Sequence, residues 1–203
     1  MSARRHHAGF PYWPVLSRLK DRDSITLRCY EELIRHNLIC TTSQVMVPRR
    51  VIDRVGLSDE RFPVSSDWDL YLRIAASDDV TFLNQKLVRY RYLATSASGP
   101  QHLRQFRWGL DVTRILRKHV GLATPSAASL VRAELARHTR ATAAAAYYYS
   151  METDHWWGRR YLFHLLVANP ASLSVSAYLL AVCAPRFVTR RFGHVVRRVL
   201  GLE

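Results

Sequence analysis

The densest cluster of polar side chains in the sequence is SSDWDLYLR, from Ser65 to Arg73. Ser and Asp in front of an apolar periodic segment are typical of a helix N-terminus, so we expect a helix from Ser65 to about Ala76. Asp67 then lies in the first turn, where the helix dipole stabilises an ionised carboxylate. Such a carboxylate, if partly exposed, can act as a general base toward a hydroxyl group. The pattern fits equally a carboxylate that only caps its own helix.

Further candidates surround Asp67. Ser66 precedes it, and Trp68 follows it either as the floor of a binding site or as a core aromatic. Asp69 lies four residues before Arg73, a spacing that allows an ion pair on one helix face. Arg89 and Arg91 alternate along a segment expected to be a strand, which would place both on one face. There they would bind a diphosphate or an acceptor, or simply charge the surface of an edge strand.

Two short segments resemble known functional motifs, but we predict no chemistry from either. Asp21-Arg22-Asp23 matches the metal-binding pattern DxD. No apolar strand precedes it, however, and Asp23 is better explained as the cap of a helix that extends to about His36. The segment RQFRW, from Arg104 to Trp108, has Arg where the QxxRW motif of processive polysaccharide synthases has Gln. Chance similarity on an amphipathic helix explains it, so processivity is not predicted.

The predicted secondary structure that positions these residues changes near residue 98. Residues 1–20 are expected to be irregular, and 21–98 to mix helices with short strands. Besides the two helices above, we expect a helix over 49–55 that ends at Gly56, and strands over 42–47, 80–83 and 87–92. Residues 99–203 are expected to be helical throughout, over 101–120, 126–151, 156–168 and 171–184, with a basic amphipathic tail over 186–200.

Composition and charge restrict the class of protein. The 203 residues are 48% hydrophobic and 23% charged, as in an ordinary globular protein. The net charge of +14 favours anionic partners: phosphorylated substrates, anionic lipid or nucleic acid. An Arg-rich and Ala-rich composition can also follow from a GC-rich genome. The three cysteines fit no disulfide or zinc pattern, and no signal peptide is visible, which predicts a cytoplasmic protein.

Several segments in order resemble the second half of family-2 GT-A glycosyltransferases. These are Asn37, then TSQVMV from Thr42, then the turn from Val55 to Glu60, then SDWDLYLR from Ser66. LVRYRY, from Leu87, followed by Ser96 and Ser98, is similar to a later segment of that family. The fold class implied is α/β, a partial GT-A (Rossmann-like) half with few strands, followed by an all-α region.

The resemblance also implies a reaction. Asp67 aligns with the carboxylate proposed as the base that deprotonates the acceptor hydroxyl, whereas Ser66 replaces the usual preceding Glu. The implied partners are a nucleotide-sugar donor and a glycan or lipid-linked acceptor. A divalent metal, Mg or Mn, is expected for the complete family, with its ligands mostly in the first half. That half is not in this sequence, so a separate chain would supply it, or the chain is truncated.

Two other functions remain open from the sequence. Aromatic, apolar and Arg residues alternate over 155–163 and 187–200, as in helices that lie on anionic membranes. A non-catalytic membrane-surface protein is therefore one alternative, and a peripheral position at the inner face of the plasma membrane would also suit a transferase. The charge alone suggests a nucleic-acid-binding protein, but no specific nucleic-acid partner is predicted because no recognition motif is present.

Overall fold

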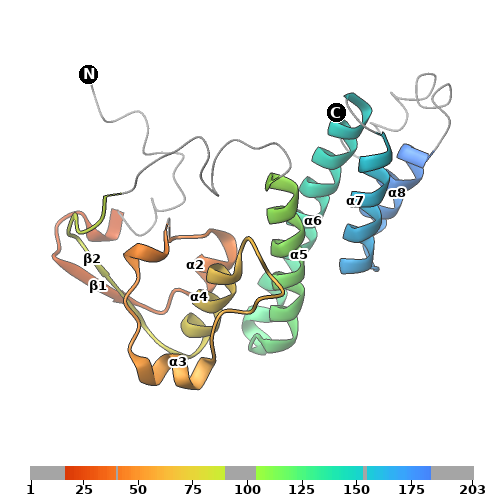
Figure 1. The fold of residues 1–203 in the computed structure, drawn as a ribbon. Helices are drawn as coiled ribbons and strands as arrows, with labels where there is room; N and C mark the ends of the chain where they lie inside the picture. The colour runs from red at the N-terminus through yellow and green to blue at the C-terminus, as the bar shows by residue number, and fades with distance from the viewer. Residues whose placement is uncertain (1–16, 40, 90–103, 153–154, 184–203) are drawn as a thin grey trace. The chain divides into compact units, whose positions relative to one another are not determined.

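A computed structural model describes residues 17–39, 41–89, 104–152 and 155–183 (Figure 1). These residues divide into two compact units. Unit 1 consists of the described residues within Met1–Gly99 together with Pro125–Leu130, and unit 2 of those within Pro100–Thr124 and Val131–Glu203. The described chain is mostly helical, with one small antiparallel sheet.

Unit 1 contains short helices and the sheet. Its elements are β1 (Ser24–Leu27), α2 (Tyr30–Arg35), the 3-10 helix η2 (Thr42–Gln44), α3 (Arg49–Val55), α4 (Ser66–Ser77) and β2 (Val80–Leu83). β1 pairs with β2 in antiparallel register, Ser24 opposite Leu83 and Leu27 opposite Val80. Thr26 and Thr81 face each other across the pair, with their hydroxyl oxygens 2.9 Å apart. The strand predicted over 80–83 is therefore confirmed.

Two of the elements predicted before residue 48 are wrong. The helix expected from Asp23 to His36 begins only at Tyr30, because the residues before it form β1 instead. Asp23 therefore precedes a strand and caps no helix, and its carbonyl accepts the backbone N–H of Asn84 at 2.8 Å. The strand expected over 42–47 is replaced by η2, where the Gln44 side-chain oxygen accepts the Thr41 backbone N–H at 3.3 Å. That local hydrogen bond competes with an extended conformation.

The helices on either side of the loop at residues 56–65 agree with prediction. α3 ends at Gly56, whose φ of 82° lies in the left-handed region that glycine adopts without strain. α4 begins after Ser65 and buries Trp68, Tyr71, Leu72 and Ala75 on one face. α4 packs against α2 and against α3, so it forms the centre of unit 1.

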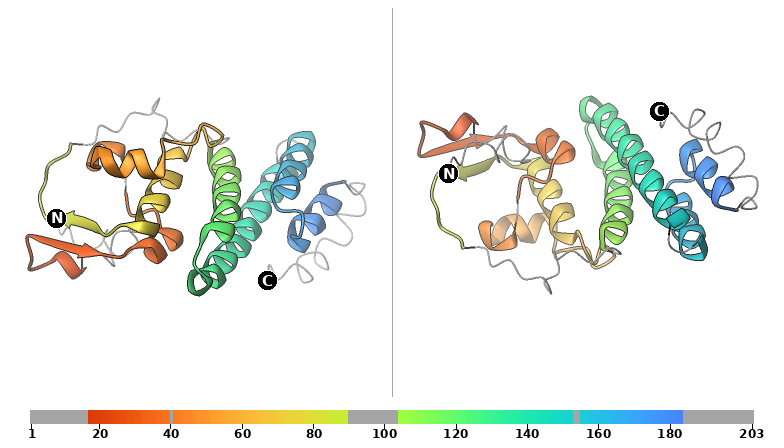
Figure 2. Two further views of the ribbon diagram at one scale, coloured as in Figure 1. Left: turned by 90° about the horizontal axis from the view of Figure 1, so that it is seen from below. Right: turned by 90° about the horizontal axis from the view of Figure 1, so that it is seen from above.

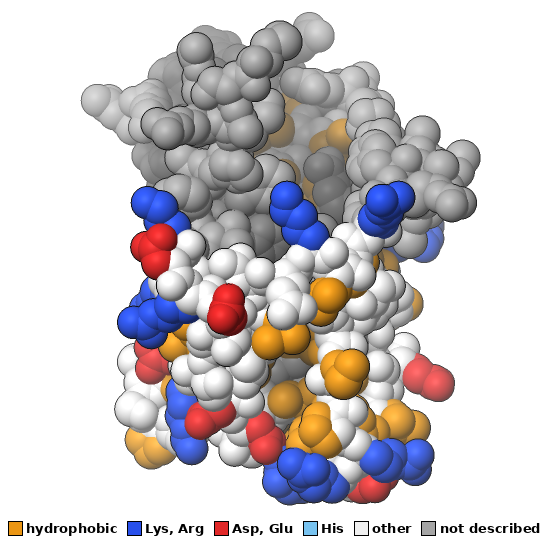
Figure 3. Space-filling view, turned by 90° about the vertical axis from the view of Figure 1, so that its left-hand side faces the viewer, with side chains coloured by type: hydrophobic (Ala, Val, Ile, Leu, Met, Phe, Trp, Pro, Cys, Tyr) orange, Lys and Arg blue, Asp and Glu red, His pale blue; other side chains and the backbone are white. Residues whose placement is uncertain are grey.

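The surface of unit 1 carries charges of both signs. Arg28 pairs with Asp79 at 3.0 Å and Arg49 with Asp53 at 2.7 Å, and all four side chains are exposed. On the face shown in Figure 3, basic and acidic side chains lie close together over the described residues. This face is therefore neither uniformly basic nor uniformly acidic.

Unit 2 is built from helices. They are α5 (Arg104–Leu122), α6 (Pro125–Glu152, from Val131 on in this unit), α7 (His155–Ala168) and α8 (Leu173–Cys183), seen from two further sides in Figure 2. α7 packs against α5 and α8. All four predicted helices are confirmed. The described residues after 98 contain no strand, as predicted, and the predicted tail over 186–200 lies outside them.

The helices of unit 2 pack around aromatic and very small residues. The Phe106 ring lies edge-on to Trp157 and Tyr161, and the Tyr161 hydroxyl donates to the Phe106 carbonyl at 2.5 Å. At Gly158, a Cβ atom would lie only 2.0 Å from the Ser150 Cβ. α6 and α7 can approach this closely only because position 158 has no side chain.

A half-buried histidine makes unit 2 sensitive to acid. Partial burial of the His138 imidazole, which contacts Trp108 and Thr142, and the nearby Arg137 charge together lower its pKa from 6.5 to about 4. The folded chain keeps His138 neutral, so the unfolded chain binds the proton first. This contribution to stability is complete above pH 6.5 and is lost as the pH falls toward 4.

We therefore expect acidification from pH 7 to 4.5 to lower the free energy of unfolding of the wild type by about 2 kcal/mol more than that of His138→Gln. Urea unfolding of both proteins at both pH values measures this difference. Equal losses in the two proteins would contradict the assignment to His138.

Candidate functional site

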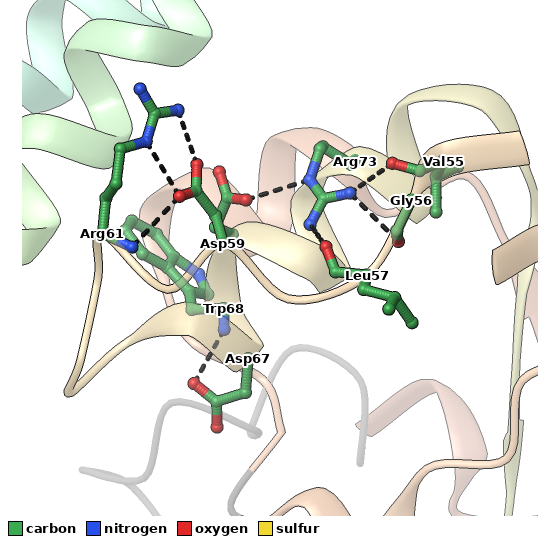
Figure 4. A network of polar contacts seen from close by, with 9 residues as sticks. Val55, Gly56, Leu57, Asp59, Arg61, Asp67, Trp68 and Arg73 are labelled. Atoms are coloured by element: carbon green, nitrogen blue, oxygen red, sulfur yellow. Dashed lines mark hydrogen bonds and ion pairs between the residues drawn. The ribbon is translucent and has the colours of Figure 1, made fainter. Parts of the chain in front are cut away.

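The candidate site lies at the N-terminus of α4, next to the loop that follows α3 (Figure 4). Asp67 and Asp69 both belong to the first turn of α4. The predicted N-terminus is confirmed, but Ser65, the residue before the helix, makes no capping hydrogen bond with its side chain. Its buried hydroxyl has no hydrogen-bond partner among the described residues. Ser66 is the first residue of the helix and is half-buried.

Arg73 holds this end of α4 against the loop. Its guanidinium Nε donates to the Asp69 carboxylate at 2.9 Å, the pair predicted from the spacing. The two terminal nitrogens donate to the backbone carbonyls of Val55, Gly56 and Leu57, the last at 2.7 Å. A single cation thus satisfies a buried carboxylate and the carbonyl oxygens at the end of α3.

Asp69 and Trp68 are fixed in the interior. The Asp69 side chain is 0% exposed, and Trp68 is buried with its indole N–H donating to the Leu33 carbonyl at 3.0 Å. Neither side chain presents polar atoms to an incoming molecule in this structure. We therefore assign both residues to positioning, although the sequence had also suggested that they bind substrate.

Asp67 is placed differently. It is half-buried, and its Oδ1 atom accepts the backbone N–H of Trp68 at 2.8 Å. In Figure 4 its carboxylate points away from the Arg73 contacts. It makes no other hydrogen bond or ion pair with the described residues, so its second oxygen is available to accept a proton. Burial of Tyr71, one turn further on, and the nearby Asp67 charge raise the pKa of its phenol to about 12.

A second ion pair was not predicted from the sequence. Asp59 binds Arg61 in a bidentate manner, with oxygen–nitrogen distances of 2.9 and 2.7 Å. The Asp59 carboxylate also accepts the Arg61 backbone N–H at 3.2 Å. Its side-chain hydrogen bonds to the guanidinium and its negative charge raise the pKa of Arg61. An acidic residue two positions before an arginine in a tight loop is the signal that could have indicated this pair.

Among the described residues, no hydrogen bond or ion pair links the basic candidates to Asp67. Arg89 is exposed and follows β2 in a segment, residues 84–89, that forms no strand. Arg91 lies outside the described residues. The strand predicted over 87–92 is thus wrong for its first three residues, and the shared face of the two arginines stays a prediction.

Metal ligation was tested on the described residues alone. Within them, no group of three His, Cys, Asp or Glu side chains could hold a metal ion. The divalent metal that the resemblance implies stays a prediction, with its ligands expected mostly in the half that is not in this sequence, and no step proposed below passes through one. Over the same residues, none of the helices combines the length and the apolar character needed to cross a bilayer.

Comparisons with known proteins add no family to this geometry. The chain matched no protein-family model, no curated protein and no solved structure.

Proposed function

We propose that this chain is the acceptor-side part of a glycosyltransferase of the GT-A type, with Asp67 as the general base. The placement of Asp67 is the observation that carries the proposal. Among the carboxylates of the first turn of α4, one is buried and paired with Arg73, whereas Asp67 is half-buried and keeps an oxygen unoccupied among the described residues. Two carboxylates with such different surroundings can serve different purposes.

The chemistry assigned to Asp67 is a proton transfer. The acceptor hydroxyl gives its proton to the Asp67 carboxylate as the hydroxyl oxygen forms a bond to the anomeric carbon of the donor sugar. The bond from that carbon to the nucleoside diphosphate breaks, and the diphosphate oxygen keeps the electron pair. The attack comes from the side opposite the leaving group, so the configuration of the anomeric carbon is inverted.

The surroundings of Asp67 suit this role. The hydrogen bond from the Trp68 backbone fixes one carboxylate oxygen, while the indole of Trp68 is itself held by the Leu33 carbonyl. The Arg73 contacts fix the same turn of the helix from its other side. A base held in this way loses little conformational freedom when the acceptor binds.

We expect Asp67→Asn to reduce sugar transfer at least about hundredfold, because the amide cannot accept the proton. The amide oxygen still accepts the Trp68 N–H, so the free energy of unfolding should change by less than about 1 kcal/mol. Asp53→Asn, which removes an exposed carboxylate from α3, is the matched control and should leave transfer unchanged.

The measurement is best made in cells of the source organism that lack the gene, complemented with each variant. Mass spectrometry of their glycans and lipid-linked sugars shows which product is lost and regained. If deletion changes no glycan, the transferase proposal is wrong. If Asp67→Asn restores the product as well as the wild type does, the base is a different residue.

A further inference from the structure

Helix α7 is apolar on two opposite faces. One face is buried in unit 2 and consists of Tyr161, Leu162, Leu165 and Ala168. The opposite face carries Trp156, Phe163 and Val167, whose exposed fractions are 66%, 56% and 62%. At about 100° per residue, these three side chains fall within a stripe roughly 40° wide. We call them the α7 stripe.

The α7 stripe is unusual for a surface. Single exposed apolar residues are common, but three large ones along one side of a helix expose a line of apolar side chains to water. α7 also packs against α5 and α8, so its core-facing side is already covered. In unit 2 the three side chains of the stripe keep more than half of their surface exposed.

The charge of Arg160 and of the sequence that follows it indicates what covers the stripe. Arg160 is exposed and lies next to the stripe on the helical wheel. Positions 155–202 of the sequence contain seven arginines and not one acidic residue. This contrasts with unit 1, where Figure 3 shows both signs of charge on one face. A second copy of this chain would bring the same positive charge to the contact, which disfavours self-association. An anionic bilayer has the complementary charge.

We propose that the α7 stripe inserts into the interface of a bilayer that contains anionic phospholipid, with α7 lying parallel to the surface. Trp156 would place its ring against the upper part of the acyl chains and its indole N–H at the headgroup boundary, where indole rings concentrate. Phe163 and Val167 would reach the acyl chains, and Arg160 would extend to the lipid phosphates. The proposal does not depend on the transferase activity proposed above.

The test is flotation of the purified full chain with vesicles, either of phosphatidylcholine alone or with 30% phosphatidylglycerol. We expect binding to the anionic vesicles that weakens as salt is raised, and much weaker binding to the neutral ones. Trp156→Gln/Phe163→Gln should lose at least about tenfold in partitioning to the anionic vesicles. Circular dichroism shows whether this variant keeps its helices.

The matched control replaces two exposed apolar residues of unit 1. Met46→Gln/Leu57→Gln removes two large apolar side chains that are even more exposed than Trp156 and Phe163, and this variant should bind vesicles as the wild type does. A loss of equal size in this control would overturn the proposal, and so would unchanged binding of the Trp156→Gln/Phe163→Gln variant. The second outcome would instead indicate attachment through another segment, such as the basic residues over 186–198.

Insertion is measured separately from binding. Brominated acyl chains quench tryptophan fluorescence only at contact range, so wild type bound to brominated vesicles should be quenched. Trp156→Phe should still bind, because Phe keeps the apolar contact, but most of the quenching should disappear. Quenching that persists in Trp156→Phe would place a different tryptophan in the bilayer and overturn the assignment to the α7 stripe. Concentration-dependent dimerisation without vesicle binding would overturn it in favour of a second copy.

Discussion

Gly158→Ala is expected to destabilise the protein by about 3 kcal/mol or more. The added Cβ would lie 2.0 Å from the Ser150 Cβ and 2.5 Å from its hydroxyl oxygen, well inside contact distance. Ser150 is fully buried, and its hydroxyl donates to the Tyr147 carbonyl at 2.7 Å, so its side chain has no space to move into. The clash is relieved only if α6 and α7 separate. Thermal unfolding followed by circular dichroism measures the loss.

Two variants isolate the cause of this loss. Gly121→Ala changes another helical glycine, near the end of α5, whose Cβ would meet no atom within 4 Å. It should raise the stability slightly, by up to about 0.5 kcal/mol, since alanine favours the helix. Adding Ser150→Gly to Gly158→Ala removes the atoms in conflict and should recover part of the lost stability. A double variant no more stable than Gly158→Ala would show that the contact with Ser150 is not the cause.

Arg73→Met should cost about 3 kcal/mol, because it leaves the Asp69 carboxylate buried without its cation. The carbonyls of Gly56 and Leu57 lose their donor at the same time. Methionine keeps most of the aliphatic length, so the change tests charge and hydrogen bonding more than volume. Urea unfolding at neutral pH gives the difference in free energy.

The control for this prediction is an arginine that forms an ion pair on the surface. Arg54 binds Asp78 with its side chain 55% exposed, so Arg54→Met should cost less than about 1 kcal/mol. Asp69→Asn/Arg73→Met removes both charges and should be more stable than the sum of the two single changes predicts. Equal effects of Arg73→Met and Arg54→Met would refute a special role for the buried pair.

Predictions from sequence succeeded where local signals decide the structure. The cluster at Ser65 and the glycine at position 56 mark helix ends through their own backbone preferences, and α3 and α4 begin and end near those marks. The Asp69–Arg73 pair follows in the same way from a spacing of four on one helix. The helices of unit 2 were predicted to within a few residues, and α5 has the clearest periodic apolar pattern among them.

The failures have physical causes as well. Ser24–Leu27 forms a strand because it pairs with Val80–Leu83, and no local pattern reveals a partner so distant in sequence. The reach of Arg73 to the carbonyls after α3 depends on how α3 and α4 pack. For the same reason, the sequence could mark Asp67 as a candidate base but could not show that Asp69 and Trp68 would be buried.

The contacts of Arg73 have a consequence for how unit 1 folds. They join residues that are 16 to 18 positions apart, so only a short loop must close for α3 and α4 to meet. The hydroxyl contact across the sheet joins residues 55 positions apart and requires a much larger loop. Contacts of short range form faster on average. We therefore expect α3 and α4 to meet early in folding and the two strands to pair later.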